Sequence, residues 1–87
     1  MKYKVELTRT AEKQLESIPK SDVKKIAKRI DKLVIDPFPN GSEKLKGSEN
    51  TYRIRQGDYR ILYSVFEKTL VILVFKISHR REVYRDL

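Results

Sequence analysis

The chain has 87 residues and a net charge of +8, with 39% hydrophobic and 37% charged residues, which suits one basic domain over residues 1–87 and polyanionic partners such as nucleic acid or an acidic protein. It has no cysteine and one histidine, which excludes disulfides, cysteine nucleophiles and cysteine-based zinc sites, and we expect neither a metal nor a cofactor. The longest apolar run, residues 70–75, is far shorter than the roughly 20 residues that span a bilayer, and the N-terminus lacks the apolar segment of a secretory signal, so we expect a cytoplasmic protein without membrane contact.

The first predicted elements are a strand and a short helix. Residues 2–7 alternate between apolar and charged side chains, as in a half-buried strand. Thr8 or Thr10 can cap a following helix, which ends before Pro19. Its apolar side chains recur at helical spacing at Ala11, Leu15 and Ile18.

A second helix follows, and its apolar stripe is the longest in the chain. The stripe consists of Val23, Ile26, Ala27, Ile30, Leu33 and Val34. We expect this helix to begin near Ser21 or Asp22 and to end before Asp36-Pro37, because the residue before proline avoids the helical region. The two helices would form a hairpin with a connection of about two to four residues.

The remaining chain is predicted to contain a loop and three strands. Residues 37–50 hold two of the three prolines and two of the three glycines and read as a loop of about 14 residues, with Leu45 anchoring it to the core. Strands are predicted over 52–55, 59–65 and 69–77, and the last is apolar on both faces, as in a central strand. The fold class is α+β, in the order β-α-α-β-β-β, with an antiparallel-rich sheet, a helical hairpin on one face and a short C-terminal segment after residue 77.

Arginine is concentrated near the C-terminus, where residues 51–87 hold six arginines and two lysines. Period-two alternation places Arg53, Arg55 and Arg60 on the face of the sheet that the helices leave open, and the turn at 56–58 makes Arg55 and Arg60 neighbours. Like charges on adjacent strands repel one another. A bound polyanion would relieve that repulsion.

Arginine, tyrosine and histidine together can cleave a phosphodiester without a metal. Guanidinium groups hold the phosphate and neutralise charge that develops in the transition state. A proton acceptor activates the 2′-hydroxyl, and a donor protonates the leaving 5′-oxygen. This chemistry requires RNA, because DNA has no 2′-hydroxyl.

Several segments of the chain together resemble the RelE/ParE superfamily of toxins from bacterial and archaeal toxin–antitoxin modules. These segments are residues 45–47 (LKG), 52–55 (YRIR), 57–63 (GDYRILY) and 77–84 (ISHRREVY). The resemblance extends over essentially the whole chain and is most specific for the RelE-like branch. It implies a small endoribonuclease that enters the ribosomal A site, cuts mRNA there and is inactivated by a cognate antitoxin.

The resemblance also implies roles for individual residues. Arg60 matches the arginine that grips the scissile phosphate, and Arg80 matches the one that supports the transition state or the leaving group. Tyr84 matches the C-terminal tyrosine that stacks on or activates the nucleotide. Arg53 and Arg55 stand where well-described members have lysine.

Because arginine cannot act as a base in proteins, the proton acceptor is expected to be Tyr84, whose pKa nearby arginines would have to lower, or else His79. Arg53, Arg55, Arg81 and Lys46 are expected to bind RNA.

Two other functions are compatible with these segments. One is a ParE-like toxin that inhibits DNA gyrase without cutting RNA, and the other is a non-catalytic RNA-binding or co-repressor module. The arginine set favours the nuclease, because a gyrase inhibitor does not need a phosphate-gripping cluster. The expected partners are a cognate antitoxin, the ribosome and mRNA, with operator DNA bound by the toxin–antitoxin complex.

Overall fold

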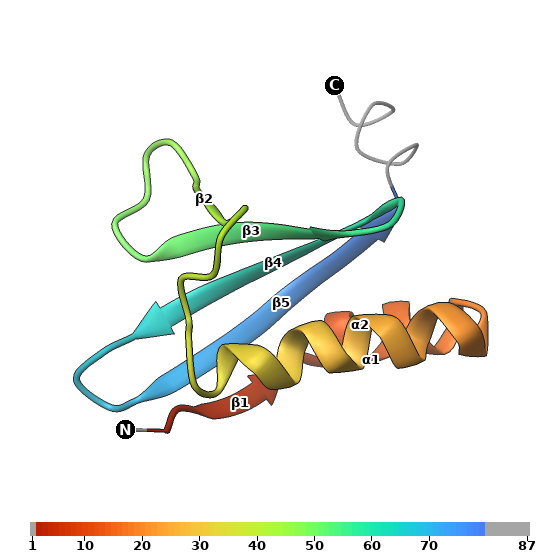
Figure 1. Cartoon of the computed structure of the whole chain (residues 1–87), viewed down its shortest axis with the longest axis horizontal. Helices are drawn as coiled ribbons and strands as arrows, with labels where there is room; N and C mark the ends of the chain where they lie inside the picture. The colour runs from red at the N-terminus through yellow and green to blue at the C-terminus, as the bar shows by residue number, and fades with distance from the viewer. Residues whose placement is uncertain (1, 80–87) are drawn as a thin grey trace.

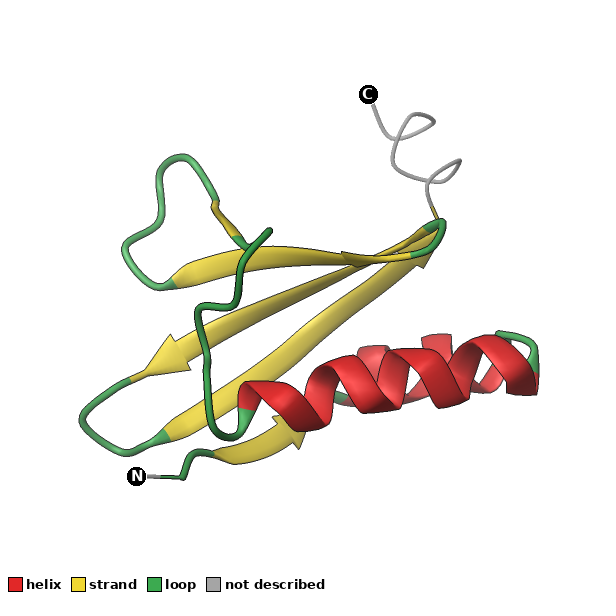
Figure 2. Cartoon of the chain, in the orientation of Figure 1, coloured by secondary structure: helices red, strands yellow, loops and turns green. Residues whose placement is uncertain are grey.

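The computed structural model describes residues 2–79 and has a helical layer packed against a twisted sheet (Figures 1 and 2). The elements in chain order are β1 (Lys4–Leu7), α1 (Arg9–Glu16), α2 (Lys20–Leu33), β2 (Glu43–Lys44), β3 (Thr51–Gln56), β4 (Tyr59–Phe66) and β5 (Val71–His79). Both helices lie on the same side of the sheet (Figure 1). No helix among residues 2–79 is both long enough and apolar enough to cross a bilayer.

The sheet has the strand order β1-β5-β4-β3-β2, with β1 parallel to β5 and every other pair antiparallel. This arrangement confirms the predicted α+β class and the central position of β5. The predicted loop over 37–50 was wrong in one respect, because it contains β2, which pairs with β3 at the edge of the sheet. The last strand also ends later than predicted, so Ser78 and His79 belong to β5.

The helical hairpin is confirmed, with residues 17–19 connecting the helices. Thr8 is the N-cap of α1, and its hydroxyl accepts a hydrogen bond from the backbone N–H of Ala11. The predicted start of α2 was late, because the helix begins at Lys20 with Pro19 as its N-cap. Proline fits this position because its fixed φ directs the chain into the first turn, although it offers no capping side chain. Ala27 is exposed and lies outside the buried stripe.

The core lies between the helices and one face of the sheet. Its buried residues are Ala11, Ile26, Ile30, Leu33, Ile54, Ile61, Tyr63, Val65, Ile72, Val74 and Ile77. They come from both helices and from the alternating inward positions of the three longest strands. In a chain this short, each of them represents a large share of the apolar area removed from water.

Ile30 provides a test of this packing, because it lies in the middle of the α2 stripe and is 6% exposed. We expect Ile30→Ala to lower the free energy of unfolding by roughly 2–5 kcal/mol through the cavity that it leaves. Urea denaturation would measure the change, with the exposed Ala27→Ser as a control that should change it little. A denaturation midpoint for Ile30→Ala equal to that of the wild type would contradict this packing.

Tyr63 connects the loop after α2 to the sheet. Its side chain is fully buried, and its hydroxyl donates a hydrogen bond of 2.8 Å to the Pro37 carbonyl oxygen. Its ring stacks on Tyr52, which in turn contacts Phe38 edge-on. Burial raises the pKa of Tyr63 to about 12.

The raised pKa of Tyr63 predicts a loss of stability in alkaline solution. The unfolded chain releases this proton at about pH 10, whereas the folded chain keeps it to higher pH, so the free energy of unfolding falls as pH rises between the two pKa values. We expect urea denaturation of the wild type to show a steeper decline from pH 9.5 to 11.5 than that of Tyr63→Phe. Equal slopes would show that this proton is not linked to folding.

A β-bulge in β5 determines which of its side chains face the helices. Leu62 pairs with Lys76 and Tyr63 pairs with Val74, so Phe75 is an extra residue in the ladder. The bulge reverses the alternation, so that Val74 before it and Ile77 after it are both buried in the core.

Two side chains of the α1 region bind the backbone at this bulge. The Thr8 hydroxyl donates to the Phe75 carbonyl oxygen at 3.3 Å. The Gln14 Oε1 atom accepts from the Ile77 N–H at 2.6 Å. The irregular backbone therefore keeps its hydrogen bonds and has a fixed position relative to α1.

Candidate nucleic-acid interface

The open face, the side of the sheet opposite the helices, carries two adjacent rows of side chains that are polar except for Leu62. The first row runs across three strands. Arg55 of β3 pairs with Arg60 of β4, and Arg60 pairs with Ser78 of β5. Neighbouring strands are about 4.8 Å apart, so the two arginines are direct neighbours. The tight hairpin makes this pairing possible, because Gly57 adopts a φ of +60° in the two-residue turn between the strands.

The second row lies two residues further along the strands, on the same face and about 6.7 Å away. Glu43 of β2 pairs with Arg53 of β3, which pairs with Leu62 of β4, and Leu62 pairs with Lys76 of β5. The Arg53 guanidinium also forms an ion pair with the Glu43 carboxylate. The edge strand β2 therefore fixes the position of Arg53, although it also neutralises part of its charge.

Between these rows lies a third row with the opposite orientation. Ile54, Ile61 and Ile77 are register partners, and all three are buried in the core. Because alternate residues of a strand point to opposite faces, the rows on either side point away from the helices. The structure therefore places the three arginines of the predicted patch on one face, as the alternation indicated.

A cavity of about 100 Å³ lies on the open face, within this patch. Its lining residues are Leu45, Arg53, Arg60, Leu62, Lys76 and Ser78. Three of the six side chains are cationic, and none is acidic. The cavity can therefore accept a small anionic group, and its apolar walls reduce the screening of the charges around it. Leu45 lines this cavity, so the expectation that it anchors the loop to the core was wrong.

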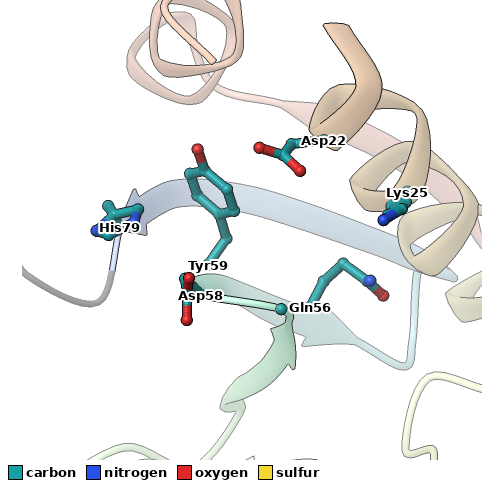
Figure 3. A pocket seen from close by; sticks show the side chains of 7 residues that line it. Asp22, Lys25, Gln56, Asp58, Tyr59 and His79 are labelled. Atoms are coloured by element: carbon teal, nitrogen blue, oxygen red, sulfur yellow. The ribbon is translucent and has the colours of Figure 1, made fainter. Parts of the chain in front are cut away.

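His79 lies on the other side of the sheet. It pairs with Tyr59 across β4 and β5, and the two rings meet edge-on with centroids 5.2 Å apart and an interplanar angle of 86°. Both line a cavity of about 200 Å³ beside the helices, together with Asp22 and Lys25 (Figure 3). The sheet separates His79 from the arginine rows, because the bulge and the alternation after it turn Ser78 and His79 to opposite faces.

Of the other predicted site residues, the structure describes only Lys46. Lys46 is exposed in the turn after β2 and does not line the cavity. Arg80, Arg81 and Tyr84 lie outside the described residues, so their predicted roles remain predictions. Within residues 2–79 no group of three or more histidine, cysteine or acidic side chains could hold a metal ion.

Sequence reasoning missed Lys76 and Ser78, which line the cavity on the open face. Both lie in β5 after the apolar run 70–75, where strict alternation from Ile72 and Val74 would have turned them toward the core. Only the bulge reverses their direction. The change from the apolar run to Lys76, Ile77 and Ser78, which alternate polar, apolar and polar, is the sequence signal that could have indicated it.

Comparisons with known proteins agree with this architecture. The profile of the family described as ParE toxin of type II toxin-antitoxin system, parDE, matches residues 5–84. The chain is 35% identical to the toxin-family protein RelE1 of Methanocaldococcus jannaschii over 99% of both chains. It is 26% identical to toxin RelG of Mycobacterium tuberculosis over 98% of this chain and 99% of that one.

Solved structures show the same likeness. The archaeal RelE–RelB complex from Pyrococcus horikoshii OT3 contains a chain with a TM-score of 0.82 and 35% identity, covering 92% of this chain and 97% of that one. The RelB–RelE complex from Methanococcus jannaschii gives a TM-score of 0.76 and 30% identity, covering 93% and 96%. The isolated RelE toxin of E. coli, at 20% identity and a TM-score of 0.79, covers 98% and 99% and shares the fold.

Proposed function

This chain belongs to the RelE/ParE superfamily of toxins from type II toxin–antitoxin systems, and from that premise we propose that it is a ribosome-dependent endoribonuclease that cuts mRNA in the ribosomal A site. The observation that carries the proposal is the open face of the sheet, where Arg53, Arg60 and Lys76 surround one cavity. Such a cluster matches the negative charge of an RNA backbone. The site of action would be the cytoplasm, where mRNA is translated.

The proposed reaction is attack of a ribose 2′-oxygen on the adjacent phosphorus. The base removes the 2′-hydroxyl proton, the bond from phosphorus to the 5′-oxygen breaks, and a proton donor protonates that oxygen, leaving a 2′,3′-cyclic phosphate and a 5′-hydroxyl. Arg60 would hold the phosphate and neutralise its growing charge, with Arg80 supporting the leaving group. Of the two candidate bases we assign Tyr84, because His79 packs against Tyr59 on the helix side.

RNA binding along the open face would extend beyond the reacting phosphate. We propose that Arg53, Arg55 and Arg81 contact neighbouring phosphates, since guanidinium groups bind phosphate through two parallel hydrogen bonds. Lys46, in the exposed turn after β2, would contact the RNA further out. The lysine-rich helices would contribute a long-range attraction of low specificity to ribosomal RNA.

The second candidate function is inhibition of DNA gyrase, because the matching profile carries the ParE description. The two functions share a fold, so the fold alone does not separate them. The cationic cavity favours the nuclease. A surface that binds a protein such as gyrase does not require Arg60 and Lys76 to face the same small cavity.

The experiment that separates these functions is translation in vitro with the purified protein, followed by mapping of mRNA 5′ ends. We expect cuts inside codons that occupy the A site, and intact mRNA when ribosomes are left out. Intact mRNA in the presence of ribosomes, together with DNA breaks linked to gyrase, would overturn the nuclease in favour of the gyrase inhibitor.

A cognate antitoxin is the proposed protein partner, as in the RelE–RelB complexes that the chain resembles. The chain has a net charge of +8, so we propose that an acidic antitoxin segment lies across or beside the open face and blocks RNA. The toxin–antitoxin complex, rather than the toxin alone, would bind operator DNA.

This partnership predicts an affinity that depends on salt. We expect the complex to remain tight at high ionic strength, because apolar contacts contribute, but its dissociation constant should rise severalfold between about 0.05 and 0.5 M salt as charges are screened. Calorimetric titration at several salt concentrations would measure this change. An unchanged dissociation constant would point to a wholly apolar interface.

A further inference from the structure

Ser78 is buried without a hydrogen-bond partner. The residue is 2% exposed, and its Oγ is the one buried side-chain polar atom among residues 2–79 that lacks such a partner. A buried hydroxyl of this kind costs folding free energy that an alanine methyl group would not. This unpaired hydroxyl belongs to a residue that lines the cavity on the open face.

The groups around Ser78 indicate what kind of ligand would complete its bonding. The cationic lining side chains, Arg53, Arg60 and Lys76, carry only hydrogen-bond donors, and the two leucines offer neither donor nor acceptor. The lining side chains therefore provide no acceptor for the Ser78 hydroxyl proton. A ligand that brings acceptor oxygens and negative charge would accept a hydrogen bond from the hydroxyl and be attracted by the cationic side chains around it, and a phosphate group has both properties.

Ser78 faces this cavity because the protein holds its strand in an irregular register. The extra residue Phe75 turns Ser78 to the open face, opposite Arg60 in the ladder. The Gln14 side chain accepts a hydrogen bond from Ile77, directly before Ser78.

We propose that Ser78 is a substrate-contacting residue, whose hydroxyl donates a hydrogen bond to a non-bridging phosphate oxygen of the RNA held in the cavity of Arg53, Arg60 and Lys76. The inference rests on the proposed function for the identity of the RNA. It adds a neutral donor at the floor of the site, which orients the phosphate, whereas the arginines supply the charge.

The test compares Ser78→Ala with Ser64→Ala, a matched control on β4 whose hydroxyl is already bonded to Thr51 at 3.3 Å. We expect Ser78→Ala to lower mRNA cleavage about 10- to 100-fold, the range for a lost hydrogen bond to a charged group, and Ser64→Ala to change it little. Ser78→Ala should also unfold at an equal or higher urea concentration than the wild type, since it removes an unpaired buried hydroxyl. A merely structural serine would instead lose stability together with activity.

A binding measurement separates this proposal from the proposed nuclease function. The probe is a short oligonucleotide with 2′-O-methyl riboses, which cannot be cut. Ser78→Ala should bind it about 10-fold more weakly than Ser64→Ala does, whether or not the wild type cleaves mRNA. Suppose that the wild type cleaves mRNA, that Arg60→Ala does not, and that Ser78→Ala cleaves mRNA and binds the probe as well as the wild type does. This outcome would overturn the role of Ser78 but not the nuclease function. Absence of cleavage by the wild type, with weakened probe binding by Ser78→Ala, would overturn the nuclease function and keep the phosphate contact.

Discussion

Arg60→Ala is expected to lower the rate of A-site cleavage by roughly 10²- to 10³-fold, the range seen when one preorganised group that stabilises developing charge is removed. Arg60 lies at the centre of the first row, between Arg55 and Ser78, and lines the cavity. Arg53 also has partners on both neighbouring strands, but its guanidinium is ion-paired with Glu43. The measurement is the rate of appearance of cut mRNA on programmed ribosomes.

The matched control for this variant is Arg9→Ala. Arg9 is exposed at the start of α1, so this substitution removes the same charge from a different part of the molecule. We expect it to change cleavage no more than a few fold, through weaker long-range attraction to the ribosome. Equal losses in the two variants would mean that only the net charge matters. We expect Arg80→Ala to lower cleavage strongly as well, and full activity in both Arg60→Ala and Arg80→Ala would disprove the site.

Tyr84→Phe is expected to produce the second large effect, a loss of cleavage of about 10²-fold or more with ribosome binding close to that of the wild type. The substitution keeps the ring and removes the hydroxyl, and general base catalysis is worth roughly 10²- to 10⁴-fold. Single-turnover cleavage and ribosome co-sedimentation would measure the two quantities separately. If the ring only stacks on a nucleobase of the mRNA, Tyr84→Phe would leave the cleavage rate nearly unchanged, whereas Tyr84→Ala would lower it.

His79→Gln is the companion variant. We expect it to retain cleavage within a few fold, because the His79 ring contacts Tyr59 on the side of the sheet that faces the helices. A large loss in His79→Gln together with a silent Tyr84→Phe would move the base assignment to His79. The histidine would then have to act from the opposite side of the sheet from Arg60.

The parts of the fold that the sequence predicted are those in which hydrophobic side chains keep a regular period. The stripe of α2 identified its buried face, and the alternation in β3 and β4 placed Arg53, Arg55 and Arg60 together. Gly57 marked the hairpin that aligns Arg55 with Arg60. In each case the pattern is local, so few residues are enough to define it.

The parts that could not be predicted depend on contacts between residues distant in sequence. β5 is apolar on both faces up to Phe75, so no alternation within that run shows where the bulge interrupts it, and the hydrogen bond from Ile77 to Gln14 spans 63 positions. The alternation of Lys76, Ile77 and Ser78 is out of step with that of Ile72 and Val74, and only the bulge reconciles the two. The strand β2 has only two residues, too few for a periodic signal.

The bulge at Phe75 determines which face of the sheet each later side chain of β5 points to. Deleting Phe75 would leave the other residues unchanged but would exchange the two sides, directing Lys76 and Ser78 toward the helices and Ile77 and His79 toward the open face. A change in the number of residues in β5 therefore has a larger effect than a change in the type of one residue. An insertion in the loop between β2 and β3, by contrast, does not change which face any strand residue points to. It follows that residue roles can be transferred between relatives by alignment only where both chains keep the bulge, because otherwise the same aligned column names side chains on opposite sides of the sheet.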